Sequence, residues 1–321
     1  MRRLIGAVLG LALLGAARMP ETFPVRLIPG AFPTDRQPDG NTVIFEDSHG
    51  LIVVDTGRHK EHQQAILELA RSRGKPIVAI VNTHWHLDHS GGNQELRAVY
   101  PAARIYTSKA IYGALDHFLA RSVENGRKKL ADPSLPEAEK ADIRLGVEAI
   151  SDRRDLLPDV PVTGTTRLAY AGRALELRLA PFAATEGDSW VYDPRARIVV
   201  AGDLVVLPLP FFDTACAAGW RQALQAIDRT DFATLYPGHG PILRHADFSL
   251  YRRAFDRLLD CAGSPAPKHA CIEGWINDAG PLIRDAQERR QARDYLDYYI
   301  DAILRDPTKQ AEYCAPAAKA G

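Results

Sequence analysis

One short polar run, residues 83–89, has the side chains of this chain that are best suited to chemistry. The chain has ten histidines, and His84, His86 and His89 fall within six positions, with Asp88 between the last two. Buried imidazole and carboxylate groups each need a polar partner, so a purely structural cluster of this kind would be costly. Nitrogen and carboxylate ligands without thiolates suit zinc, with iron or manganese as alternatives. The run therefore predicts a metal site.

Further candidate ligands follow other apolar segments. Residues 198–201 lead to Gly202-Asp203, and residues 234–236 lead to Pro237-Gly238-His239-Gly240. Upstream, the apolar residues 51–54 lead to Asp55-Thr56-Gly57. Strand ends are a common place for functional groups, so we expect these side chains to converge at one edge of a sheet sandwich.

The elements that position these residues are predicted from their apolar patterns. Residues 51–54 and 77–81 read as buried strands joined by a helix over 61–73, which makes a crossover unit ending at the histidine run. Other strands are expected at 25–28, 42–46, 104–107, 166–170, 174–179, 189–192, 198–201 and 234–236. Residues 109–160 read as a helical insertion without a clear strand. Beyond residue 245, two apolar stripes predict helices that pack on the main domain.

The motif His84-Trp85-His86-Leu87-Asp88-His89 resembles the signature of the metallo-β-lactamase-fold hydrolase superfamily. The resemblance extends from about residue 25 to 245, because Asp55-Thr56-Gly57, Gly202-Asp203 and Gly238-His239-Gly240 occur in the same order. It implies an α/β fold, the four-layer αββα sandwich, with a two-metal site at one edge. We expect this domain over residues 22–246 and a C-terminal helical extension over 247–321.

The resemblance also implies roles for individual residues. Carried over position by position, the metal ligands are His84 and His86 for a first metal, Asp88, His89 and His239 for a second, and Asp203 as a bridge. Asp55 resembles a support residue that orients a ligating imidazole. Two adjacent cations can trap a hydroxide at neutral pH and polarise the scissile group. Asp88 is the catalytic candidate, which could orient the attacking group or relay its proton.

One position departs from the family pattern. The first metal usually receives a third histidine from a His-Thr-x-Gly-Asp-like stretch, and Ala184 stands at that place here. The first metal site is therefore expected to be weak or empty, and the second to fill preferentially. Ala184 fits a one-metal or rewired enzyme, a degenerated site, or a deliberate substitution. Glu186, His117 or His245 are alternative replacement ligands.

The bridging aspartate resembles the glyoxalase II, lactonase and phosphodiesterase branches more than true β-lactamases. It implies hydrolysis of a small-molecule ester, thioester or lactone, with β-lactam turnover possible and an iron-dependent sulfur dioxygenase as a minor option. A non-catalytic metal- or ligand-binding protein is the alternative from a different class. The 40 basic and 40 acidic residues balance, which argues against nucleic acid as a partner. No residue pattern predicts the oligomeric state.

The N-terminus and the cysteines indicate the compartment. Residues 1–17 combine a basic start with an apolar stretch and small residues, which predicts a cleaved signal peptide and a periplasmic or secreted protein. A membrane anchor is the alternative, but the apolar run falls short of the ~20 residues that span a bilayer. Of the four cysteines, Cys261 and Cys271 are the expected disulfide, while free core thiols remain an alternative.

Overall fold

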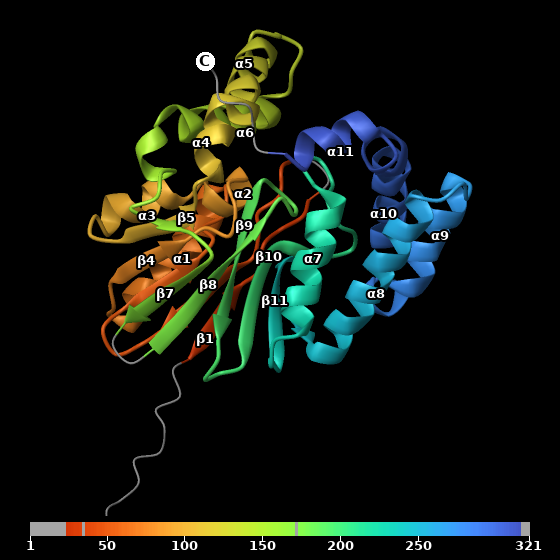
Figure 1. Ribbon diagram of the computed structural model, residues 1–321. Helices are drawn as coiled ribbons and strands as arrows, with labels where there is room; N and C mark the ends of the chain where they lie inside the picture. The colour runs from red at the N-terminus through yellow and green to blue at the C-terminus, as the bar shows by residue number, and fades with distance from the viewer. Residues whose placement is uncertain (1–23, 34–35, 171–172, 316–321) are drawn as a thin grey trace, which may run out of the picture.

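A computed structural model describes residues 24–33, 36–170 and 173–315. Two six-stranded sheets pack face to face, and helices cover their outer sides (Figure 1). This arrangement confirms the αββα sandwich. The predicted signal peptide, residues 1–17, lies outside the described residues. Within the described ranges, the helices are all too short or too polar to cross a membrane.

The first sheet contains the strand that leads to the histidine run. Its strands, in spatial order, are β1 (Val25–Ile28), β2 (Thr42–Glu46), β3 (Leu51–Val54), β4 (Ile77–Val81), β5 (Arg104–Ser108) and β6 (Val160–Val162). Strands β3 to β6 run parallel, and α1 (Lys60–Arg73) makes the predicted crossover from β3 to β4. The continuous apolar sequence of β3 reflects burial on both faces.

The second sheet contains the strands that supply Asp203 and His239. Its strands, in spatial order, are β12 (Leu243–Arg244), β11 (Thr234–His239), β10 (Ile198–Val206), β9 (Gly187–Asp193), β8 (Arg173–Pro181) and β7 (Thr165–Tyr170). β10 and β11 are parallel, and α7 (Ala217–Asp228) connects them. Residues 171–172 between β7 and β8 lie outside the described residues, and the two strands, which were expected at 166–170 and 174–179, pair antiparallel.

Apolar side chains from both sheets meet between them. Val43, Phe45 and Ile52 from the first sheet belong to the same buried cluster as Leu175 and Val191 from the second. Alternate residues of β2 and β3 point to the other side, where they pack against α1. The sheet edge that carries the candidate ligands is therefore supported by a rigid core.

Helices surround the edge where the candidate ligands lie. After the histidine run come α2 (Leu87–Ser90) and α3 (Asn93–Val99). The insertion consists of α4 (Ala110–Asp116), α5 (Phe118–Leu130), α6 (Glu137–Ser151) and the 3₁₀ turn η1 (Arg153–Asp155). The C-terminal helices are α8 (His245–Ala262), α9 (Lys268–Asp278), η2 (Gly280–Leu282), α10 (Ala286–Tyr299), the π-helical η3 (Ile300–Leu304) and α11 (Pro307–Tyr313). Figure 1 shows α5 and α6 above the sandwich and the C-terminal helices along its flank beside α7, with α11 at the end nearer to α6.

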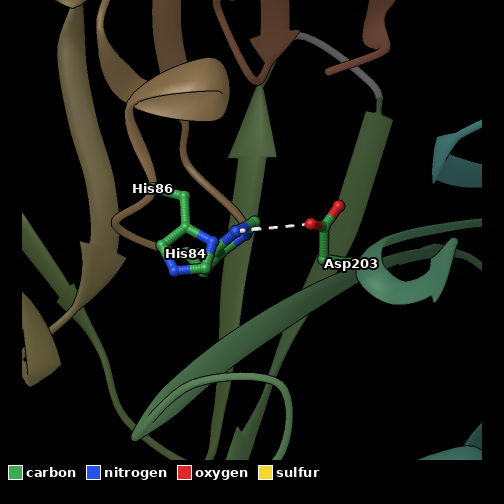
Figure 2. Close-up of side chains that lie close together, drawn as sticks. All are labelled: His84, His86 and Asp203. Carbon is green, nitrogen blue, oxygen red and sulfur yellow. Dashed lines mark ion pairs between the residues drawn. The ribbon is translucent and has the colours of Figure 1, made fainter. Parts of the chain in front are cut away.

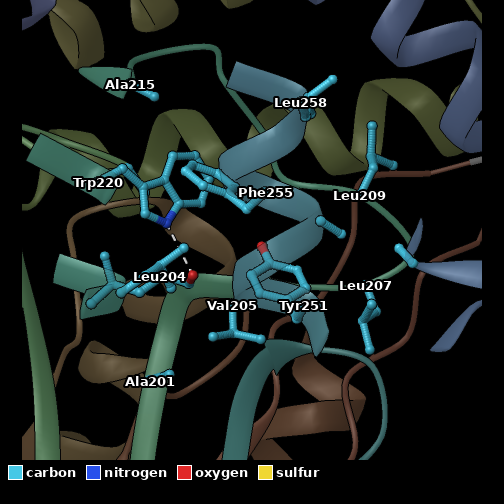
Figure 3. Close-up of a cluster of buried hydrophobic side chains, with 14 of the residues drawn as sticks. Ala201, Leu204, Val205, Leu207, Leu209, Ala215, Trp220, Tyr251, Phe255 and Leu258 are labelled. Carbon is cyan, nitrogen blue, oxygen red and sulfur yellow. Dashed lines mark hydrogen bonds between the residues drawn. The ribbon is translucent and has the colours of Figure 1, made fainter. Parts of the chain in front are cut away.

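The C-terminal helices share one apolar core with the second sheet (Figure 3). The rings of Trp220 of α7 and Phe255 of α8 pack at a tilt with their centroids 5.1 Å apart, next to Leu204 and Val205 of β10. The indole Nε1 of Trp220 donates to the carbonyl of Leu204 at 2.9 Å. The tail is thus fixed to the sheet that bears Asp203.

Two disulfides staple the C-terminal part of the chain. Cys261 and Cys271 are joined, as predicted. Cys216 and Cys314 form a second bridge across 98 residues. All four cysteines are therefore paired, and the alternative of free core thiols is wrong.

Candidate metal centre

The predicted metal-site residues come together at one edge of the sandwich. His84, His86 and His89 follow the end of β4, and His239 is the last residue of β11. Asp203 lies inside β10, which continues to Val206 rather than ending at residue 201 as expected. The pairing of β10 with β11 is irregular around Gly202, so the chain turns Asp203 toward the histidine loop.

Six side chains form two adjacent groups that could each hold a metal ion. The first group contains His84, His86 and Asp203, and the second contains Asp88, His89 and His239. Within each group the ligand atoms lie within 4.8 Å of one another. Figure 2 shows His84 and His86 on the loop facing Asp203 across the edge. The geometry thus brings together every ligand that the sequence predicted.

Asp203 lies between the two groups. Its Oδ2 is 3.8 Å from Nε2 of His84, while its Oδ1 is 3.1 Å from Nε2 of His89 and 3.6 Å from Nε2 of His239. The two carboxylate oxygens therefore address different groups, as a bridging ligand requires.

Asp88 completes the second group. Its Oδ2 accepts a hydrogen bond from Nε2 of His239 at 3.1 Å and lies 3.5 Å from Nε2 of His89. The two imidazole Nε2 atoms of His89 and His239 are 3.3 Å apart. Three ligand atoms thus point to one small volume, where a cation would relieve their crowding.

Asp55 orients ligands in both groups. Its Oδ2 is 2.8 Å from Nδ1 of His89, which leaves Nε2 of that ring to face the centre. The hydroxyl of Thr83 donates to the same oxygen at 2.8 Å, so its own oxygen can accept from Nδ1 of His84 at 3.1 Å. Nε2 of His84 is then also the free nitrogen. The contact between Oδ2 of Asp55 and Nδ1 of His89 is the one expected of a residue that orients an imidazole toward a metal.

His86 is oriented by a residue that the sequence did not single out. The hydroxyl of Thr214 donates to the carbonyl of Ala184 at 3.0 Å, and its oxygen lies 3.4 Å from Nε2 of His86. Nδ1 of His86 is left for the centre. Ala184 is buried in the loop between β8 and β9. Where the family pattern has an imidazole, this loop therefore has a methyl group, and its carbonyl accepts the hydrogen bond from Thr214.

Gly202 and Gly238 allow the carboxylate of Asp203 to lie close to both the histidine loop and β11. Gly202 has φ of 54°, and a Cβ there would lie 2.5 Å from the side chain of Thr83. A Cβ at Gly238 would lie 2.0 Å from Oδ1 of Asp203. Larger residues at either position would push β10 or β11 away from the histidine loop.

Burial and charge set the protonation of the cluster. Burial, assisted by the charge of His89, lowers the pKa of His84 well below its usual value, and burial also lowers the pKa of His86. Burial alone would lower the pKa of His89, but the carboxylates of Asp203, Asp88 and Asp55 raise it well above its usual value. Burial would raise the pKa of both Asp88 and Asp203, but the charges of His89 and His239 hold both low. Asp88 and Asp203 therefore stay ionised, and their negative charges favour positive charge at the centre.

The residues fit a divalent cation. Nε2 of His84 and Oδ1 of Asp203 are buried without a hydrogen-bond partner, although buried polar atoms are almost always paired. Both atoms face the centre, and both residues belong to the first group described above. Neutral imidazoles and carboxylates are the ligand set that zinc, iron and manganese accept.

A cavity of about 1010 Å³ opens onto the centre. His86, Asp88 and Asp203 line its floor, the insertion contributes Phe118 and Lys129, and α10 contributes further side chains. Aromatic side chains from the loop segments and α10 form much of the wall: Phe32, Trp85, Phe118, Phe211, Tyr295 and Tyr299. The insertion and α10 therefore both contribute to the wall of this cavity.

The three proposed replacements for the missing histidine are not in either ligand group. Glu186 is half-buried in the β8–β9 loop, and His117 separates α4 from α5. His245 stacks on Phe232 with ring centroids 4.6 Å apart, where it caps the core rather than the centre. The structure thus gives these side chains no place in the first group.

Several supporting residues could not be identified from their sequence context. Asn41 donates through Nδ2 to the carbonyls of Pro237 and Gly240, at 3.0 and 2.9 Å, and so fixes the loop around His239. Thr83 and Thr214 orient imidazoles through single hydroxyls. The one available signal was position, because Thr83 immediately precedes the histidine run.

The geometry agrees with comparisons to known proteins. A family model described as the metallo-beta-lactamase superfamily matches residues 36–259. A hydroxyacylglutathione hydrolase from Gloeobacter violaceus is 35% identical over 79 residues, which cover 24% of this chain and 30% of that protein. A hydroxyacylglutathione hydrolase from a Synechococcus species is 44% identical over 52 residues, or 16% of this chain and 21% of that protein. The chain thus spans less than a third of the length of these curated relatives.

Solved structures show the same fold. A metallo-beta-lactamase from Pontibacter korlensis superimposes with a TM-score of 0.54 at 19% identity, covering 73% of this chain and 99% of the other.

Proposed function

Because this chain belongs to the metallo-β-lactamase superfamily, we propose that it is a metal-dependent hydrolase of a small-molecule thioester, ester or lactone, with β-lactams as weaker candidates. The observation that supports this most strongly is the pair of ligand groups on the floor of a large cavity, bridged by Asp203. The two relatives named hydroxyacylglutathione hydrolase favour a thioester.

Bound metal ions would supply an activated water and polarise the carbonyl of the bond to be cleaved. Side chains of this protein orient the metal ligands and handle the proton of the attacking group. Asp55 holds the rings of His89 and, through Thr83, His84 in the tautomers that present Nε2 to the centre. Asp88 reaches the cavity, so its carboxylate is placed to orient the attacking group and to accept its proton at an oxygen.

Ala184 supports a further part of the proposal. Without the third imidazole, the first group has only His84, His86 and the shared Asp203, whereas the second keeps Asp88, His89, His239 and the same aspartate. We therefore propose that the second group binds its ion more tightly. Zinc is the first candidate, with iron or manganese as alternatives.

We also propose that the protein is exported. The basic and apolar residues 1–17 support this, and so do the two disulfides, since such bonds persist in oxidising compartments.

Steady-state assays on the metal-loaded protein test the reaction. The substrates are S-lactoylglutathione, an aliphatic lactone, an aryl ester and a β-lactam, each tested with the wild type and with Ala184→His. We expect thioester turnover by the wild type and faster turnover by Ala184→His. Turnover by Ala184→His alone would support a degenerated centre, and no turnover by either protein would favour the non-catalytic alternative.

A further inference from the structure

Arg58 is a cation in the substrate cavity that has no partner of its own. It follows the Asp55-Thr56-Gly57 turn and lines the same cavity as His86 and Asp88. Its Nε is buried without a hydrogen-bond partner. Within the described ranges no carboxylate pairs with its guanidinium, whereas Arg36 of the same cavity is paired with Glu61.

An unpaired guanidinium in such a place is costly for the fold. Charged groups that leave water are normally paired and hydrogen-bonded, because burial without a partner removes their hydration without supplying another favourable interaction. Arg58 is only partly exposed, so water compensates for part of this cost. A ligand that enters the cavity would supply the missing acceptor.

The backbone holds Arg58 in place. Its N–H donates to Oδ1 of Asp39 at 2.6 Å, and its carbonyl accepts from Nε2 of Gln63 at 2.8 Å. Asp39 is fixed in turn by His59, whose Nδ1 is 2.8 Å from the other carboxylate oxygen. The base of the side chain is therefore ordered before any ligand arrives, which reduces the entropy lost on binding.

The acidic residues of the cavity do not neutralise Arg58. Asp142 of α6 also lines this cavity, but it accepts from Nε2 of His59 at 3.2 Å and from the N–H of Gln37 at 3.1 Å. Glu139 lies on the exposed side of α6. Opposite Arg58, α6 has Gly146, and a Cβ built there would lie 3.7 Å from Nη1. Gly146 therefore lets the buried backbone of α6 pack close to this side of the guanidinium.

We propose that Arg58 binds a carboxylate of the substrate while the bond to be cleaved lies at the metal centre. This rests on the proposed function and names its substrate class: a thioester or ester that bears a free carboxylate. A guanidinium can donate two parallel N–H bonds to a carboxylate, which fixes the orientation of the bound molecule as well as its affinity. The aromatic wall formed by Trp85 and Phe118 would contact the apolar remainder.

Binding of a matched pair of probes tests this without turnover. The probes are 3-(benzylthio)propanoic acid and its primary amide, which differ in charge but hardly in shape, titrated calorimetrically into the metal-loaded protein. We expect the wild type to prefer the acid by about 10- to 100-fold, the range of a charge-assisted hydrogen bond. Arg58→Gln should remove this preference, and Arg58→Lys should restore part of it.

Arg290→Gln is the matched control, because Arg290 is an exposed cation of α10 that lines the same cavity. It should keep the preference for the acid. An acid preference that survives in Arg58→Gln, or no preference in the wild type, would overturn the proposal. An acid preference at Arg58 without hydrolysis of any substrate would contradict the proposed function and leave the carboxylate site established.

Discussion

Asp55 connects the two halves of the metal centre, although it lies beneath the cavity. It accepts hydrogen bonds from the N–H and hydroxyl of Thr83 and from Nδ1 of His89. Its φ of 61° is in the left-handed region, which aspartate tolerates better than most residues. A buried carboxylate that accepts from three donors, on a residue with a strained backbone, is typical of a site that is organised before its ligand binds.

Asp55→Asn should weaken metal binding by about 10- to 100-fold, the usual effect of losing a group that orients a ligand. The amide would place an NH₂ group against donors from Thr83 or His89, so one imidazole would lose its fixed tautomer. Competition with a coloured chelator measures the affinity. Asp47→Asn is the control, because Asp47 is buried at the opposite end of β3. Equal affinities for the two variants would show that Asp55 does not orient the ligands.

At this scale the sequence predicted the candidate ligands and Asp55, but not the other polar side chains that hold them. Histidine and aspartate at the spacing of His84 to His89 have few uses besides metal binding, so residue type alone was informative. Threonine and asparagine occur throughout the chain, and their roles depend on where one hydroxyl or amide points after folding. Thr214 and Asn41 therefore emerged only from the structure.

His59 connects two elements that form the wall of the cavity. It stands directly before α1, and its ring contacts Asp39 through Nδ1 and Asp142 of α6 through Nε2. The insertion is thus attached to the sandwich through a buried imidazole between two carboxylates. Loss of this contact should loosen α6 more than the metal centre.

The His59 contact predicts a pH-dependent stability. Burial alone would lower the pKa of His59, but the hydrogen bond and charge of Asp39 raise it above the usual 6.5. Burial would raise the pKa of Asp39, but the hydrogen bonds from His59 and from the backbone lower it to about 2. The histidine stabilises the fold fully below pH 6.5 and less as pH rises through its folded pKa. The aspartate stabilises it above its unfolded value and less as pH falls toward about 2.

His59→Gln should therefore lower the free energy of unfolding by about 3 kcal/mol near pH 5, the cost of breaking a buried pair, and by clearly less near pH 9. Urea denaturation at the two pH values measures the difference. His245→Gln, which replaces a half-buried histidine on α8, provides the control for the loss of an imidazole outside this contact. A loss that is the same at both pH values would rule out an ion pair at His59.

Long apolar strands and amphipathic helices were predictable, but short edge elements were not. β3 and β4 are continuous apolar runs, and α1 shows the helical spacing of buried residues, so each was recognisable. β6 and β12 have three and two residues and exist only because a neighbouring strand pairs with them. The extension of β10 past Gly202 follows its pairing with β11, where Gly202 lies opposite Pro237 and Val206 opposite His239, and no local pattern encodes this pairing.

The whole molecule is a sandwich whose C-terminal tail is closed by a disulfide. Cys216 directly precedes α7, and Cys314 directly follows α11. The loop of chain that this bridge closes therefore contains all of the C-terminal helices. Tyr295 and Arg290 of this enclosed region line the cavity. The bridge therefore constrains both the fold and one wall of the candidate site.

The two disulfides should contribute unequally to stability. In the chain-entropy description, removing a bridge across about 100 residues costs about 4.7 kcal/mol, whereas one across about 15 residues costs about 3 kcal/mol. Cys216→Ser with Cys314→Ser should therefore destabilise the protein more than Cys261→Ser with Cys271→Ser, whose partners are 10 residues apart. Urea denaturation compares the two double variants. The reverse order would mean that local strain, not loop length, decides their contribution.

The metal content of the purified protein, measured by mass spectrometry after dialysis, tests the central claim most directly. With Asp88, His89, His239 and Asp203 as one full set, and Ala184 in place of the third ligand of the other, the wild type should retain a single tightly bound ion per chain. Ala184→His should retain two. Two tightly bound ions in the wild type would contradict the weakened first site, and no bound ion in either protein would contradict the metal centre itself.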